Sequence, residues 1–141
     1  MTSPRMKSVI LCRDLALVAA LVFVCVESTS LLSSPFGAYC NPHGPWGSAI
    51  SNGVMILIVI PVIVAGCIAL FHSNARVVRI ALILILAGGI GNLVSRVRFG
   101  CVFDIMFFER YPAFNIADVM LTFGGAILAC VLLRNEKDAS L

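Results

Sequence analysis

The chain has 141 residues, of which 60% are hydrophobic and only 12% are charged, and its mean hydropathy is +1.05. A soluble domain cannot bury that much apolar surface, so the composition excludes the soluble classes and indicates an integral membrane protein. The net charge is +3, and nothing in the sequence suggests nucleic-acid binding.

Four segments are apolar enough to cross a bilayer, which needs roughly 20 apolar residues per helix. They are Leu15–Leu32, Val54–Phe71, Val77–Val94 and Ile116–Leu133. A closed β-barrel would show alternating polarity instead, and these segments do not. The sequence therefore predicts an all-α membrane protein, a four-transmembrane-helix bundle forming one integral domain over residues 1–141, with short extracytoplasmic segments between the helices.

The lysines and arginines are unevenly distributed around these segments. Those before the first segment, around the junction of the second and third, and after the fourth are Arg5, Lys7, Arg13, Arg76, Arg79, Arg134 and Lys137. The other three lie between the third and fourth segments, and the first loop has none. The positive-inside rule then predicts cytoplasmic termini and two outer loops. The first segment is long for a cleavable signal sequence and indicates a retained anchor.

The six cysteines show no CxxC or histidine-containing ligand spacing, so we expect neither a metal nor another cofactor. Cys25, Cys67 and Cys130 fall in the middle of predicted helices, where cysteine is ordinarily a small apolar residue. Cys40 and Cys101 both fall on the predicted outer side. A disulfide between them can form in an oxidising compartment, and the sequence leaves that pairing open.

Small and polar residues gather at the end of the third segment. Gly88, Gly91 and Ser95 share one helix face, which allows close helix packing in lipid. Asn92 and Arg96 also share a face, one turn apart. A packing seam with an interfacial arginine accounts for the glycines and for Arg96. It does not account for Asn92, because an amide at that depth needs a hydrogen-bond partner.

Two aspartates, Asp104 and Asp118, follow this face, although a carboxylate near hydrocarbon is costly. Singly, Asp104 is an interfacial charge in a short apolar run that lies in the interface or packs as a strand. Asp118 is singly a first-turn helix acid with Asn115 as N-cap. Both lie toward the outer side and can meet. Two adjacent carboxylates can share one proton, so that one acts as general base and the other as general acid.

Three motifs carry a resemblance to a known family. Gly-Gly-Ile-Gly-Asn-Leu-Val-Ser-Arg, Gly-Cys-Val-Phe-Asp and Phe-Asn-Ile-Ala-Asp together resemble bacterial lipoprotein signal peptidase, also called signal peptidase II. The resemblance implies an aspartic endopeptidase that removes the signal peptide from diacylglyceryl-modified prolipoproteins just before the lipidated cysteine. It also implies that Asp104 and Asp118 are catalytic, and that Asn92, Arg96 and Asn115 order the site and bind substrate.

The first outer loop extends the resemblance, because Cys-Asn-Pro-His-Gly-Pro-Trp-Gly looks like a variant of a family motif in which Asn41 binds substrate. His43 in this loop is a lone histidine, which we expect to be solvated. Two positions depart from the family pattern. The first-helix motif keeps an acid, Glu27, as a supporting residue but has Leu31 in place of a lysine, and Ser95 replaces an acidic residue.

The resemblance implies a location in the bacterial inner membrane, with the site near the outer face and with prolipoprotein as substrate. We also expect membrane lipid as a partner, and a monomer. The two departures leave open a catalytically inactive, lipoprotein-binding homologue. A proton or cation carrier that relays through Glu27, Asp104 and Asp118 is a further alternative. It is disfavoured because all three acids lie toward the outer end rather than through the membrane depth.

Overall fold

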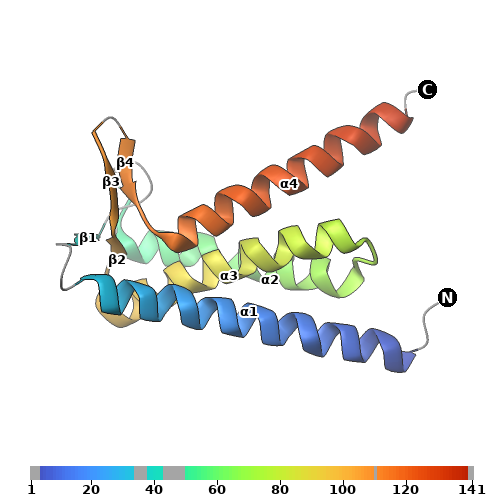
Figure 1. Cartoon of the computed structure of the whole chain (residues 1–141), viewed down its shortest axis with the longest axis horizontal. Coiled ribbons are helices and arrows are strands. Elements are labelled where there is room, and N and C mark those ends of the chain that lie inside the picture. Colours follow the sequence, from blue (N-terminus) through green and yellow to red (C-terminus); the bar gives the residue numbers. More distant parts are fainter. Residues whose placement is uncertain (1–3, 34–37, 43–49, 110, 140–141) are drawn as a thin grey trace.

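The computed structural model describes residues 4–33, 38–42, 50–109 and 111–139. Four long helices dominate it (Figure 1): α1 Pro4–Ser33, α2 Asn52–His72, α3 Arg76–Phe99 and α4 Ile116–Ala139. Each contains a stretch that is long and apolar enough to span a membrane. The predicted all-α membrane protein with four membrane-spanning helices is therefore confirmed.

The helices extend beyond the apolar segments that predicted them. The α1 helix begins at Pro4 rather than near Leu15, and α3 continues past Val94 to Phe99. Hydropathy detects only the part of a helix that matches the hydrocarbon thickness. The helix ends beyond that thickness carry polar and charged residues, so a prediction based on apolar runs misses them.

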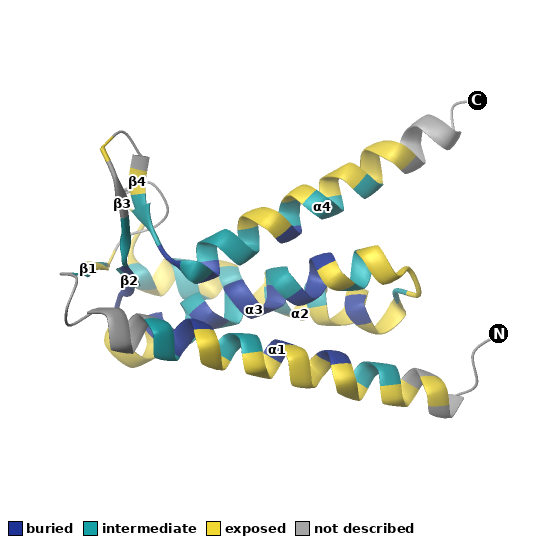
Figure 2. Ribbon diagram, viewed as in Figure 1, coloured by how far each residue is buried: buried dark blue, intermediate teal, exposed yellow. Residues whose placement is uncertain are grey.

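The α3 helix lies at the centre of the bundle and packs against each of the other three helices (Figure 1). The buried positions concentrate along it, whereas α2 and the second half of α4 are largely exposed (Figure 2). Its core cluster joins α1, α2 and α3 through Val18, Leu70, Leu82, Ile83 and Leu86. Apolar side chains on the exposed faces suit contact with lipid tails, in which helices pack through van der Waals contacts rather than the hydrophobic effect.

Glycines bring α3 close to its neighbours. A Cβ at Gly88 would collide with the backbone oxygen of Ala117 in α4, and one at Gly91 would lie 3.0 Å from Cys25 Cβ in α1. The predicted role of this face in close helix packing is therefore confirmed. The close approach matters for the site because it places Asn92, next to Gly91, against the start of α4.

Four short strands cover the end of the bundle away from both termini, which we call the strand end (Figure 1). The strands β1 Tyr39–Asn41 and β2 Val102–Asp104 pair antiparallel, as do β3 Met106–Phe108 and β4 Tyr111–Phe114. The apolar run around Asp104 is thus a strand, one of the two forms expected for it. A disulfide joins Cys40 to Cys101, with their Cα atoms 5.6 Å apart, and so closes the pairing that the sequence left open.

An ion pair ties three helices together at the opposite end, which we call the termini end. Asp14 of α1 has a fully buried side chain, and its Oδ2 accepts a hydrogen bond of 2.8 Å from Arg79 Nε of α3. Arg13 donates to the other oxygen at 2.9 Å. Arg79 Nη1 also donates to the carbonyl oxygens of Leu70 and Ser73, at the end of α2. One guanidinium therefore fastens α1, α2 and α3.

The sequence did not point to this ion pair. The charge distribution gives Arg13 and Arg79 only a role in topology, whereas both lie within helices and contact Asp14. A buried carboxylate of this kind needs a partner from another helix. Linear sequence does not show which distant arginine supplies it.

Candidate active site

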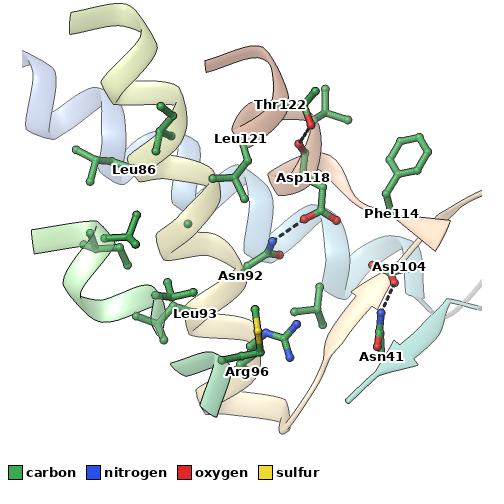
Figure 3. A pocket seen from close by; sticks show the side chains of 18 of the residues that line it. Asn41, Leu86, Asn92, Leu93, Arg96, Asp104, Phe114, Asp118, Leu121 and Thr122 are labelled. Carbon is green, nitrogen blue, oxygen red and sulfur yellow. Dashed lines mark hydrogen bonds between the residues drawn. The ribbon is translucent and has the colours of Figure 1, made fainter. Parts of the chain in front are cut away.

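A cavity of about 590 Å³ opens beside α3 at the strand end (Figure 3). Most of its wall is apolar and comes from α2, α3 and α4. Its polar and charged lining includes Asn41, Asn92, Arg96, Asp104 and Asp118. Five residues that the sequence analysis selected, from four separate elements, thus border one space.

Asp118 is fixed at the start of α4 by a reciprocal capping arrangement. The Asn115 side chain accepts a hydrogen bond of 3.0 Å from the backbone N–H of Asp118, and the backbone N–H of Asn115 donates to Asp118 Oδ2 at 3.2 Å. This is a capping box, in which residues three apart satisfy each other's unpaired helix groups. The predicted N-cap role of Asn115 is confirmed, and it aims the Asp118 carboxylate at α3.

Asn92 connects α3 to this cap. Its Nδ2 donates to Asp118 Oδ1 at 2.8 Å (Figure 3), and its Oδ1 accepts from Asn115 Nδ2 at 3.1 Å. Both oxygens of Asp118 therefore accept hydrogen bonds, one from a side chain and one from the backbone. Donors at both oxygens fix the orientation of the Asp118 carboxylate. The side-chain amide of Asn92, which needs hydrogen-bond partners at this depth in the membrane, therefore has them in Asp118 and Asn115.

Asp104 ends strand β2 and is 97% buried, with a relative exposure of 3%. Asn41 Nδ2, from β1, donates to its Oδ2 at 3.1 Å (Figure 3). The pKa of Asp104 is raised from 3.8 to about 6, and burial is the largest cause. The hydrogen bond from Asn41 opposes this rise, the charge of Asp118 adds to it, and Asn115 and the positive charge of Arg96 oppose it. Asp104 thus keeps its proton to a higher pH than an ordinary aspartic acid does.

Arg96 is buried and held by a residue that the sequence analysis did not select. Its Nη1 donates to Asn52 Oδ1 at 3.1 Å, and Asn52 Nδ2 donates back to the Arg96 carbonyl oxygen at 3.4 Å. The guanidinium charge remains close enough to Asp104 and Asp118 to interact with both. Asn52 begins α2, and its spacing in the sequence gave no sign that it would face α3.

Asn115 and Glu27 are not among the described residues that line the cavity. Asn115 is buried and acts through its contacts with Asp118, Asn92 and Asp104. Glu27 is half-buried on α1. Ser95 is buried in α3, whereas His43 and the side chain of Leu31 fall outside the described residues.

The fold and the site define a class, a multi-pass membrane protein with two aspartates on one cavity near the end of its helices. Residues 23–134 match the model of the family described as signal peptidase (SPase) II. The match covers most of the chain, which therefore belongs to the signal peptidase II family, a family of bacterial membrane peptidases.

Individual relatives agree with that assignment. A lipoprotein signal peptidase of Halothermothrix orenii is 36% identical over 115 residues, which cover 79% of this chain and 79% of that protein. One from Pelotomaculum thermopropionicum is 31% identical over 140 residues, covering 94% and 91%. A solved structure described as a bacterial membrane enzyme matches with a TM-score of 0.78 and 22% identity, over 89% of this chain and 90% of that one. The structural likeness supports the fold.

Proposed function

We propose that the chain is an aspartic endopeptidase that removes the signal peptide from diacylglyceryl-modified prolipoproteins, just before the lipidated cysteine. Membership of the signal peptidase II family supports the substrate class. The observation that carries the mechanism is the pair Asp104 and Asp118, which border one cavity in different hydrogen-bonding environments.

The two environments suggest a division of roles. Asp118, with donors at both oxygens, is the ionised general base that takes a proton from water. Asp104, whose pKa burial raises to about 6, is the protonated partner that donates to the carbonyl oxygen of the scissile peptide. Water adds to the carbonyl carbon to give a tetrahedral diol. The C–N bond then breaks as Asp118 passes the proton from water to the leaving nitrogen, and a hydroxyl of the diol returns a proton to Asp104. The pair titrates as a unit, so its macroscopic pKa values belong to both residues.

The cavity wall suits a substrate that is half lipid and half peptide. Apolar side chains from α2, α3 and α4, such as Val59, Ile63 and Leu121, face the acyl chains and the signal-peptide helix. Asn41 and Arg96 line the polar part, where the peptide backbone around the scissile bond would lie. Glu27 remains a candidate supporting residue on α1, outside that wall.

The proposed orientation places the strand end at the outer face of the bacterial plasma membrane and both termini in the cytoplasm. The distribution of basic residues supports it. So does the disulfide between Cys40 and Cys101 at the strand end, because disulfides persist in oxidising compartments outside the cytosol. We propose that the chain acts there as a monomer, since the cavity is built within one chain.

The test is cleavage of a lipidated prolipoprotein by the purified protein in lipid. We expect Asp104→Asn and Asp118→Asn each to lower the rate by roughly 10²–10⁴-fold, the usual contribution of general acid–base catalysis. Glu109→Gln removes an exposed carboxyl between β3 and β4 and serves as the matched control, with an unchanged rate.

Two results would decide against the proposal. Full cleavage by either asparagine variant would remove the aspartate pair from the mechanism. Absence of cleavage by the unaltered protein, together with tight prolipoprotein binding, would favour the inactive lipoprotein-binding homologue, for which Leu31 and Ser95 are the departures to examine.

A further inference from the structure

Strand β1 supplies Asn41 to the site, yet little backbone pairing holds it there. It has three residues, and its neighbour in the sheet is β2, which also has three. The register places Tyr39 opposite Asp104 and Asn41 opposite Val102. An isolated two-stranded pair of this length is marginal in water. Something beyond the strand hydrogen bonds has to keep Asn41 at Asp104.

The disulfide sits where such a restraint is needed. Cys40 immediately precedes Asn41, and Cys101 immediately precedes β2, which ends at Asp104. The bond therefore joins the two strands directly beside the residues that meet at the cavity. It connects positions 61 residues apart in the chain, with all of α2 and α3 between them. A cross-link across so long a loop removes much of the freedom of its ends.

We propose that the Cys40–Cys101 disulfide is a positioning element of the active site, which holds Asn41 so that its amide donates to Asp104. This inference rests on the proposed function for its catalytic meaning, but its geometric content can be measured without catalysis. Cys40 and Cys101 are not among the described residues that line the cavity, and we propose that their bond affects the site only by positioning Asn41.

The Asn41 amide has a measurable effect on Asp104. Its hydrogen bond lowers the pKa of Asp104, against the larger effect of burial. The charged groups of described residues that act on Asp104 are Asp118 from α4 and Arg96 from α3, and neither touches the disulfide. Replacing Asn41 by alanine should therefore raise the pKa of Asp104, but only while the disulfide keeps β1 in place.

The bond is open to chemical manipulation. Cys101 is buried, whereas Cys40 is exposed, so a small dithiol can reach the bond from the Cys40 side. Dithiothreitol would reduce the disulfide to two thiols and would itself be oxidised to its cyclic disulfide, a balanced two-electron exchange. Cys12, Cys67 and Cys130 are exposed and take part in no disulfide of the described residues, so they provide internal references for alkylation.

The experiment is a double-mutant cycle between Asn41→Ala and the pair Cys40→Ser/Cys101→Ser, in the full-length protein in lipid. We expect Asn41→Ala to lower cleavage about ten-fold in the oxidised protein, the scale of one lost hydrogen bond. In the double-serine background it should change cleavage by less than about two-fold, because the two changes remove the same interaction. Dithiothreitol should reproduce the double-serine rate in the unaltered protein and leave the double-serine protein unchanged.

A second readout needs no activity. The titration of Asp104 is obtained from the pH dependence of thermal unfolding, after subtraction of the same curve for Asp104→Asn. Asn41→Ala should shift this titration to higher pH in the oxidised protein and leave it unshifted in the double-serine protein. If the unaltered protein proved inactive, the proposed function would be wrong. The shifts of the Asp104 titration in the four proteins of the cycle would still decide the role of the disulfide.

Two outcomes overturn the inference. Alkylation followed by mass measurement can find Cys40 and Cys101 both free in the unreduced protein, which removes the bond itself. Alternatively, the effects of Asn41→Ala and of the serine pair can prove independent in the titration cycle. The disulfide would then be a general staple that stabilises the fold without positioning Asn41.

Discussion

Asp14 at the termini end and Asp104 at the strand end are both buried aspartates, but their surroundings differ. Asp14 is bonded directly to the guanidinium of Arg79 and has no exposed surface. Asp104 accepts a hydrogen bond from the neutral amide of Asn41 and borders a cavity. A carboxylate that is paired directly with an arginine is committed to one charge state. A carboxylate that is held by amides remains able to take up or release a proton, as general acid–base catalysis requires.

The arginines differ in the same way. Arg79 donates hydrogen bonds to Asp14 and to two carbonyl oxygens at the end of α2, so it holds three helices together. Arg96 is held by Asn52 and influences Asp104 and Asp118 through its charge. The contrast predicts that changes at the termini end alter stability and that changes at the strand end alter catalysis. Three variants test that separation.

The largest effect is expected from Asp14→Asn, which leaves the Arg79 charge buried without its partner. Breaking a buried ion pair by removing one member costs about 3–5 kcal/mol, so the unfolding temperature in detergent should drop sharply. Cleavage per folded molecule should stay within about two-fold of the unaltered protein, because the pair lies away from the cavity wall.

Arg13→Gln is the control for that variant. Arg13 also bonds Asp14, but its side chain is 65% exposed, so its loss should change stability little. If Asp14→Asn abolished cleavage at unchanged stability, the two ends would not be separable and the comparison would fail.

Local rules explain which parts of the strand end could be predicted from the sequence. Asn92 and Arg96 lie one turn apart, and Asn115 and Asp118 have the spacing of a helix cap, so both pairs follow from helix geometry. That Asp104 and Asp118 border one cavity was expected because the segment between them begins and ends on one side of the membrane. The resemblance then added Asn41, whose contact with Asp104 lies across 63 residues of sequence.

The missed residues depend on packing between distant elements. Asn52 and Asp14 each meet an arginine of α3 from another helix, and no periodicity indicates which one. The three-residue strand β1 is too short to show alternation. The sequence allowed a disulfide between Cys40 and Cys101. Whether these cysteines meet depends on the pairing of β1 with β2, which the sequence does not show.

A smaller effect is expected from Asn52→Ala. The guanidinium of Arg96 would lose the hydrogen bond to Asn52 and could turn toward Asp104. Arg96 and Asp104 would then form an ion pair like that of Arg79 and Asp14. We expect cleavage to fall about ten-fold, the scale of a hydrogen bond to a charged group, and the pKa of Asp104 to fall because a nearer positive charge favours the ionised form.

Asn74→Ala, in the exposed turn between α2 and α3, is the matched control for Asn52→Ala and should leave cleavage unchanged. Unaltered cleavage and an unaltered pH profile in Asn52→Ala would show that Asn52 does not restrain Arg96. The stability of both variants should remain close to that of the unaltered protein, since neither change touches Asp14 or Arg79.

The smallest effect is a pH dependence of stability that Asp104 should produce at the strand end. The pKa of Asp104 is about 6 in the folded protein, above its ordinary value of 3.8, so folding favours the protonated form. Its contribution to stability is therefore greatest below about pH 4 and is lost as the pH rises through 6. Thermal unfolding between pH 4 and 7 should show this decline, and Asp104→Asn should remove it whereas Glu109→Gln should not.

The alkaline limb of cleavage should fall in the same range, because the proposed general acid loses its proton there. Equal slopes in the unaltered protein and in Asp104→Asn would mean that Asp104 is not the carboxyl that keeps its proton, and the acid and base roles would have to be exchanged.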